Sequence, residues 1–400
     1  MTSAVTGIKL AFSLALLTAG PAFTQIPHSE ATPKVTSAAP VAYVYVQTTK
    51  GVLVYGATAA GQLTLVEGSS FADTGQMGAI NSSYLASVGA NDLHTYAIES
   101  GGGVGKQASE INTQNYGGGA CGNNIGGALL DHTGKYLYVL LSGPSNTTPC
   151  SALQSYKLAS NGELTFLGDA ENDTYGVHGS DFPVGISTFS GNDNFAYGII
   201  ADEYADLFSA FTRNSSGELV TNANFTHVDP TPDPAVADSQ YYPLAVAADP
   251  TNHLAVVVNE PFDNSPPPQL ASYTINSTTG NISSTNTWQN MPTLAFFFNN
   301  ISMSPSGKFL AVVGQGVEIY NFNGASPLTL ASSLPLPDRD FDNLAWDNNN
   351  HLYTVDYETG NLYVYTVTAT SITAAPGSPY TIPNNIDSYY QYDLIVVPKP

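Results

Sequence analysis

Positive charge is scarce in this 400-residue chain, which has 10 Lys and Arg against 32 Asp and Glu and a formal net charge of -22. Only two of the basic residues are arginines, Arg213 and Arg339. A surface of this sign repels phosphate backbones and anionic lipid, so we expect no nucleic-acid partner and no adhesion to acidic membranes. Most of the acidic side chains are interpreted as keeping the protein soluble.

Cysteine is also rare, with Cys121 and Cys150 as the one pair. Two cysteines without zinc-ligand spacing predict a disulfide in an oxidising compartment rather than a metal site. The sequence has no phosphate-binding glycine loop, no nucleophile elbow, no metal-binding histidine pair and no EF-hand spacing. We therefore expect neither a cofactor nor a bound metal.

Long apolar runs are missing after the N-terminus, where Lys9 precedes the short run LAFSLALLTAG over residues 10 to 20. This layout predicts a signal peptide over 1–24, cleaved after Ala22 or Thr24, because the run is too short to span a bilayer. Residues 25–40 are rich in Pro, Ser, Thr and Ala and predict a flexible lead-in. We expect a secreted or periplasmic monomer, with residues 41–400 as its single domain.

Turn and strand formers are abundant: the chain has 36 Gly, 26 Pro and 11% aromatic residues. Five segments repeat one plan, a turn followed by an apolar strand. They are DHTGKYLYV from Asp131, SGNDNFAYGI from Ser190, DPTNHLAVV from Asp249, SPSGKFLAVV from Ser304 and DNNNHLYTV from Asp347. The plan predicts a β-hairpin in each repeat.

Each hairpin belongs to a longer unit, with a third strand that often contains Tyr or Phe and a fourth strand opened by a turn such as GELTFL from Gly162. Four antiparallel strands in each repeat predict the blades of an all-β propeller. Two weaker units, over 41–71 and 76–113, raise the count from five to seven. The alternative is a five-bladed ring beside a separate N-terminal domain.

The first unit has no inner strand of its own. We expect YDLIVVP, residues 392 to 398, to supply that strand from the other end of the chain. Such closure removes the free sheet edges of an open ring.

In this strand order, loops that enter inner strands and loops that leave second strands share one face of the disc. Cys121 and Cys150 both belong to it. Carboxylates follow the second strands of three blades, and they could converge near the central channel. They are Asp202, Glu203, Glu260 and Asp356. The alternative interpretation is a set of separate, solvated loop ends.

Loops that enter the inner strands add further candidates for ligand binding. They are His178, Asp181, Tyr241, Tyr242, Phe341 and Asp342. Aromatic and acidic side chains suit sugars or other polar uncharged rings, although the aromatics could equally serve packing. His178 is the candidate base, because an imidazole titrates near neutrality. On the opposite face, His132, His253 and His351 are interpreted as surface residues.

The repeat D-x-x-G-K-x-L-Y-V, with its Tyr-ended third strand and G-E-L before the fourth, resembles the seven-bladed lactonase-like propeller family over about residues 41–400. That family includes 6-phosphogluconolactonases and a carboxymuconate-lactonizing branch. The resemblance implies hydrolysis of a cyclic ester. Family members commonly carry an H-P-H type segment, where this chain offers His178 followed by Pro183. Arg213 and Arg339 lie in different blades, so a phosphorylated lactone is not expected.

Two functions follow. The first is an exported lactonase for an unphosphorylated lactone, in which His178 and one of Glu203, Glu260 or Asp356 assist a water molecule. The alternative is a non-catalytic propeller that binds a carbohydrate, a peptide or a protein partner, because the fold does not fix the function.

Overall fold

The computed structural model of the protein describes residues 38–69, 71, 76–116, 124–144, 149–171, 186–202, 205–230, 242–259, 268–291, 298–324, 328–332, 339–356, 358–383 and 394–399. Residues 38–400 form one compact unit. The predicted signal peptide and nearly all of the lead-in lie outside the described residues, and both stay predictions. The described part contains no helix with the length and apolar character needed to cross a bilayer.

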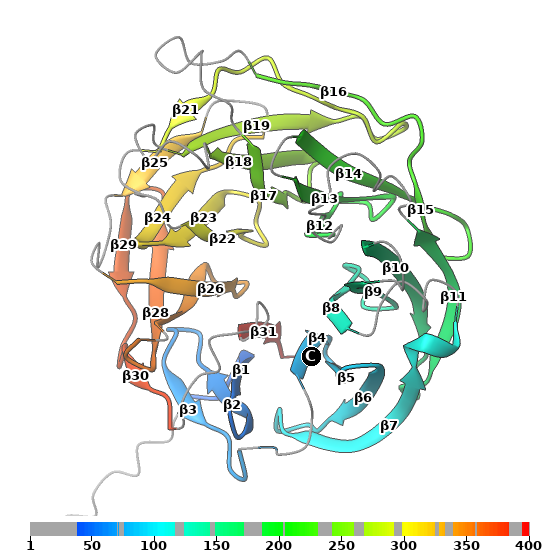
Figure 1. Ribbon diagram of the computed structural model, residues 1–400. Coiled ribbons are helices and arrows are strands. Elements are labelled where there is room, and N and C mark those ends of the chain that lie inside the picture. The colour runs from blue at the N-terminus through cyan, green and yellow to red at the C-terminus, as the bar shows by residue number, and fades with distance from the viewer. Residues whose placement is uncertain are drawn as a thin grey trace, which may run out of the picture. The chain divides into compact units, whose positions relative to one another are not determined.

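The unit contains seven separate sheets, named blades 1 to 7, arranged as a ring (Figure 1). Blade 1 joins β31 (Leu394–Pro398) to β1 (Ala42–Thr48), β2 (Gly51–Ala57) and β3 (Leu63–Leu65). Blade 2 contains β4 (Gln76–Ile80), β5 (Tyr84–Val88), β6 (Asp92–Ile98) and β7 (Val104–Asn112), followed by the 3-10 helix η1 (Thr113–Asn115). Blade 3 contains β8 (Asn124–Leu130), β9 (Tyr136–Pro144), β10 (Pro149–Leu158) and β11 (Leu164–Glu171).

The remaining blades follow in chain order around the ring. Blade 4 contains β12 (Thr188–Phe189), β13 (Phe195–Asp202), β14 (Ala205–Arg213) and β15 (Leu219–Thr221). Blade 5 contains β17 (Tyr242–Ala248), β18 (His253–Asn259), β19 (Gln269–Ile275) and β20 (Ile282–Ser283), with β21 (Gln289–Asn290) paired to β19. Blade 6 contains β22 (Phe298–Met303), β23 (Phe309–Gly314), β24 (Gly316–Asn321) and β25 (Thr329–Ser332). Blade 7 contains β26 (Phe341–Trp346), β27 (His351–Asp356), β28 (Asn361–Thr368) and β29 (Ser371–Ala374), with β30 (Tyr380–Thr381) paired to β28.

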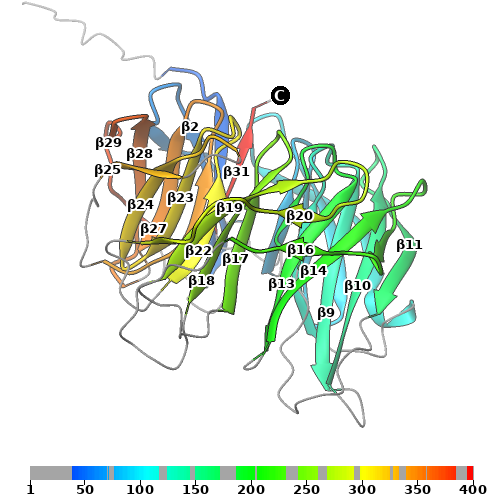
Figure 2. The same ribbon diagram turned by 90° about the horizontal axis from the view of Figure 1, so that it is seen from above.

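The prediction of a seven-bladed propeller with four antiparallel strands in each blade is confirmed, and the five-bladed alternative is excluded. The closing strand is also confirmed, because β31 pairs with β1 from Ala42↔Pro398 to Val46↔Leu394. One feature was not predicted. The short strand β16 (His227–Val228) follows blade 4 in the chain but pairs in parallel with β20 and covers the outer edge of blade 5. Figure 2 shows the sheets standing side by side around the ring.

The hydrophobic core lies between the blades, so each sheet is buried on both of its faces. All seven residues of β1 are buried. Val44 and Val46 pack toward Val355 of blade 7, whereas Tyr45 packs toward Leu85 of blade 2. Burial on both faces explains why the second strands are continuous apolar runs rather than alternating ones.

Neighbouring blades are joined by one recurring contact, in which a ring near the start of a second strand lies against a glycine of the next blade. That glycine occupies the turn between the third and fourth strands. The pairs are Tyr43 with Gly102, Tyr84 with Gly162, Tyr136 with Gly217, Phe195 with Gly280, His253 with Gly324 and His351 with Gly61. At three of these junctions a tyrosine hydroxyl also donates to the glycine carbonyl, as from Tyr138 to Gly217 over 2.8 Å.

His351 is therefore not a surface residue, and that interpretation was wrong. It is 3% exposed because its ring fills the space beside Gly61 of blade 1. Its Nδ1 lies 2.7 Å from Asp347 Oδ2, and the hydroxyl of Tyr353 donates to the same oxygen over 3.0 Å. The side chain of His132, in contrast, is 60% exposed.

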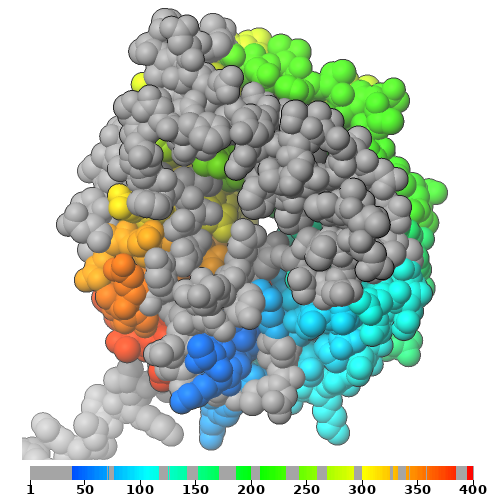
Figure 3. Space-filling view, viewed as in Figure 1, coloured from blue at the N-terminus to red at the C-terminus, as the bar shows by residue number. Residues whose placement is uncertain are grey.

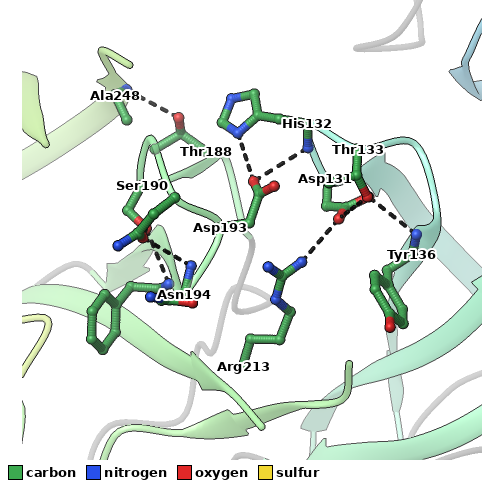
Figure 4. A network of polar contacts seen from close by, with 12 residues as sticks. Asp131, His132, Thr133, Tyr136, Thr188, Ser190, Asp193, Asn194, Arg213 and Ala248 are labelled. Atoms are coloured by element: carbon green, nitrogen blue, oxygen red, sulfur yellow. Dashed lines mark hydrogen bonds and ion pairs between the residues drawn. The ribbon is translucent and has the colours of Figure 1, made fainter. Parts of the chain in front are cut away.

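A second set of contacts joins blades 3 and 4 on the face of the hairpin turns, where Figure 4 shows a polar network. Arg213 donates from Nη1 to the buried Asp131 over 2.9 Å, and its guanidinium lies 5.5 Å from the ring centroid of Tyr136. His132 Nδ1 lies 2.6 Å from Asp193 Oδ1 across the same junction. One of the two arginines is thus committed to holding blades together.

Inner strands of five blades share an irregularity near the end where the chain enters them. Each contains one extra residue opposite its second strand, which is a β-bulge. The extra residues are Gly78, Gly126, Leu244, Asn299 and Asp342. These bulges bend the inner strands at one end of the central channel.

Gly217→Ala is expected to lower the free energy of unfolding by about 3 kcal/mol, as measured by urea unfolding. The residue has a φ of +96°, and a Cβ added to it would lie 2.0 Å from Tyr136 Cε1. Gly360 is the matched control, since its φ is +67° and a Cβ there would meet nothing within 4 Å. Gly360→Ala should cost only about 1 kcal/mol. Equal losses would show that the ring contact does not hold the blades together.

Stability should depend on pH in opposite directions at two junctions. Burial opposes ionisation of Asp347, but hydrogen bonds from His351 and Asn349 hold its pKa below 3.8, so its contribution is complete above pH 3.8 and lost as the pH falls further. The hydrogen bond to Asp193 raises the pKa of His132 above 6.5, so its contribution is complete below pH 6.5 and lost as the pH rises through the raised value.

Asp347→Asn should therefore flatten the acid limb of a plot of unfolding free energy against pH, and His132→Gln should flatten the alkaline limb. Urea unfolding between pH 2 and 9 measures both slopes. A variant whose slope equals that of the parent chain would refute the assignment at its junction.

Candidate functional site

The predicted site face holds most of the candidate residues, and several of these lie outside the described residues. They are Cys121, His178, Asp181, Glu203, Tyr241 and Glu260. Four more belong to strands whose backbone pairing the structure describes. They are Cys150 in β10, Asp202 in β13, Tyr242 in β17 and Asp342 in β26. The roles of all ten side chains, including the disulfide, stay predictions.

Two predicted residues, Phe341 and Asp356, meet in blade 7, where they are direct partners across β26 and β27. Both are fully buried, with 0% exposure. Phe341 packs edge-on against the ring of Tyr363, with 5.5 Å between the ring centroids. The structure therefore gives Phe341 a packing role at the end of the inner strand.

Asp356 uses its carboxylate to organise the chain around it. One oxygen accepts from the backbone N–H of Thr359 over 3.1 Å, and the other accepts from the Thr359 hydroxyl over 2.6 Å. Arg339 Nη1 lies 3.6 Å from Asp356 Oδ2. The Asp356 carboxylate has no exposed surface, so it does not face solvent water. With these partners it is suited to positioning the Arg339 guanidinium.

Arg339 is the cationic group at this face that sequence reasoning did not single out. Its side chain is 40% exposed, whereas the side chain of Arg213 is 16% exposed and committed to Asp131. Within the described residues the Arg339 guanidinium makes no hydrogen bond, since 3.6 Å to Asp356 is an ion-pair distance. Its N–H donors are thus available to a bound molecule. The scarcity of arginine, together with its position before an inner strand, was the signal that could have identified it.

The backbone fixes Arg339 at the boundary between blades 6 and 7. Its carbonyl accepts from the N–H of Gly316 over 2.7 Å, and Asp340 forms a β-bridge with Gln315. Both contacts reach the turn between β23 and β24. Arg339 therefore lies beside the entrance to inner strand β26. A space-filling view along the same direction as Figure 1 shows an opening near the centre of the ring (Figure 3).

The described ranges contain no group of three or more His, Cys, Asp or Glu side chains arranged to hold a metal ion. The described residues of this face contain a hydrogen-bond donor, the Arg339 guanidinium, which is held by the buried carboxylate of Asp356. Such an arrangement can bind a carbonyl oxygen, a carboxylate or an oxyanion.

No protein-family model matches the chain, and no curated protein matches it. Solved structures do match its fold. One is a Bacteroides fragilis protein provisionally described as a 6-phosphogluconolactonase, with a TM-score of 0.58, 12% identity and coverage of 91% of this chain and 99% of that one. Another is a protein from Lactobacillus plantarum, with a TM-score of 0.61, 14% identity and coverage of 89% and 98%.

A third match is a functionally unknown protein from Desulfotomaculum acetoxidans, with a TM-score of 0.54, 14% identity and coverage of 86% and 97%. At these identities the likeness concerns the fold alone. The chain therefore shares its propeller fold with a protein provisionally described as a 6-phosphogluconolactonase, in line with the resemblance of its repeat.

Asp356→Ala is expected to lower the free energy of unfolding by about 2–4 kcal/mol, because it removes a buried, charged acceptor and the two hydrogen bonds that it receives from Thr359. Arg339→Gln should cost about 1 kcal/mol or less, since its side chain is partly exposed. Urea unfolding of both variants tests the division of roles. Equal losses would contradict the view that Asp356 is structural and Arg339 is free to bind.

Proposed function

We propose that this protein is an exported lactonase-like propeller that hydrolyses an unphosphorylated lactone at the entrance to its inner strands. The observation that carries the proposal is the half-exposed Arg339, fixed by buried Asp356 beside the inner strand of blade 7. In ester hydrolysis the carbonyl oxygen becomes negatively charged in the transition state. A donor held in place for that oxygen stabilises this charge.

In the proposed reaction, His178 accepts a proton from water while the water oxygen attacks the lactone carbonyl carbon. Arg339 donates hydrogen bonds to the resulting oxyanion. As the tetrahedral intermediate collapses, the ring C–O bond breaks and protonated His178 returns the proton to the departing alkoxide. The product is the open-chain hydroxy acid, and the balance requires only lactone and water.

The charge of the protein supports a neutral substrate. A phosphorylated lactone requires several cations around its phosphate, whereas the chain has two arginines and one of them is committed to Asp131. A net charge of -22 also repels anions at a distance and favours release of an anionic hydroxy acid. Export, proposed from the apolar N-terminal run, would give the protein access to lactones outside the cytoplasm.

A panel of unphosphorylated lactones, assayed with a pH indicator, tests the proposal. Arg339→Gln is expected to lower kcat by about 10²–10³-fold, the usual effect of removing one oxyanion donor. Lys308→Gln is the matched control, because it removes one positive charge from an exposed residue in the hairpin turn on the opposite face. That variant should retain the activity of the parent chain.

Absence of turnover above background on every lactone would refute the enzymatic proposal. Binding of a lactone without turnover would instead favour the second function class, a non-catalytic propeller that binds a small molecule. Full activity of Arg339→Gln would refute the role of Arg339, and full activity of His178→Ala would refute the choice of base.

A further inference from the structure

Leu244 is an exposed leucine at an unusual place. Its exposed fraction is 41%, although it belongs to inner strand β17, where Pro243, Val246 and Ala247 are buried. In the part of the chain that the structure describes, the other strongly exposed large apolar residues lie on outer strands, beside a strand end or beside η1. They are Val41, Leu65, Tyr116, Val220, Val228 and Leu330.

The β-bulge of β17 explains this exposure. Pro243 pairs with Val258 and Ala245 pairs with Val257, so Leu244 is the extra residue that opposes no partner on β18. A bulge bends its strand and redirects a side chain, which is why bulges are frequent beside active sites. Ala245 and Ala247 pack between blades 5 and 6, whereas Leu244 does not belong to this cluster.

The bulge also places Leu244 at the level of the proposed site. Leu244 in blade 5 corresponds to Asp342 in blade 7, because each is the bulged residue of its inner strand. Arg339 comes just before Asp342 in the chain. Blades 5, 6 and 7 are consecutive, so only inner strand β22 stands between β17, which carries Leu244, and β26, which Arg339 precedes, as the ring in Figure 1 shows.

We propose that Leu244 is a specificity-determining residue that contacts an apolar substituent of the substrate. This inference rests on the proposed function and narrows its substrate class to lactones with an aliphatic side chain, in preference to polyhydroxylated sugar lactones. A bound alkyl group would remove the exposed leucine surface from water, and this burial favours the complex. Arg339 would interact with the carbonyl end of the same molecule.

The chemistry of the two groups explains the selectivity. A sugar lactone would place hydroxyl groups against Leu244, where they would lose hydrogen bonds to water without gaining others. An alkyl chain has no such loss. Discrimination should therefore increase with the length of the substituent until the exposed surface of Leu244 is covered.

The experiment compares kcat/KM for γ-lactones that carry side chains of increasing length, and for an aldonolactone. Leu244→Ser should lower kcat/KM for the long-chain substrates by about tenfold and change it by less than about twofold for the unsubstituted lactone. Leu330→Ser is the matched control, because Leu330 is 42% exposed on outer strand β25. It should preserve the dependence on chain length.

Binding of unreactive alkyl lactams, measured by calorimetry, separates this inference from the proposed function. If Leu244→Ser and Leu330→Ser show the same dependence on chain length in both turnover and binding, the role of Leu244 is refuted while the lactonase stands. If lactams bind in a Leu244-dependent manner without turnover of any lactone, the catalytic proposal fails and Leu244 remains a binding residue. If neither lactones nor lactams bind, both proposals are overturned.

Discussion

A ring from the second strand of one blade lies against a glycine in the next blade at six of the seven junctions. A side chain at that glycine would occupy the space of the ring, so each contact sets how closely two blades can approach. The tyrosine hydroxyls that bond to three of these glycine carbonyls fix the register of the contact. At the remaining junction, between blades 6 and 7, Phe309 stacks on Trp346 instead. The burial of apolar strands between the sheets depends on this regular spacing.

This arrangement assigns different tasks to the two faces of the ring. The face with the hairpin turns carries carboxylates that accept from the backbone of their own turns, as Asp131 and Asp249 do. It also carries the network of Arg213, Asp131, His132 and Asp193 that joins two blades. These carboxylates and the Arg213 guanidinium are already hydrogen-bonded within the protein. The opposite face carries Arg339, whose guanidinium keeps its donors available among the described residues.

The proposed site uses backbone geometry as much as side-chain chemistry. Contacts from blade 6 to the backbone of residues 339 and 340 hold the segment that bears the guanidinium, and Asp356 sets the direction of that group. A bulge exposes Leu244 at the same level of the ring. One donor and one apolar surface, separated by a single inner strand, suit a small molecule with a carbonyl at one end and hydrocarbon at the other.

The sequence by itself determined the fold, because the signals that define a blade are local. Turn residues followed by apolar strands predict hairpins wherever they occur, and their repetition predicts the ring. Its closure was predicted from residues 392 to 398, of which Leu394–Pro398 form the closing strand. Only the tertiary structure decided which polar groups are buried and which are free. His351 is buried against Gly61 of another blade, and Asp356 is paired with Arg339 from the segment that enters the neighbouring inner strand β26. The exposure of Leu244 depends on a one-residue bulge. Burial, pairing and strand register all depend on segments distant in the chain, and no local pattern in the sequence specifies where those segments meet.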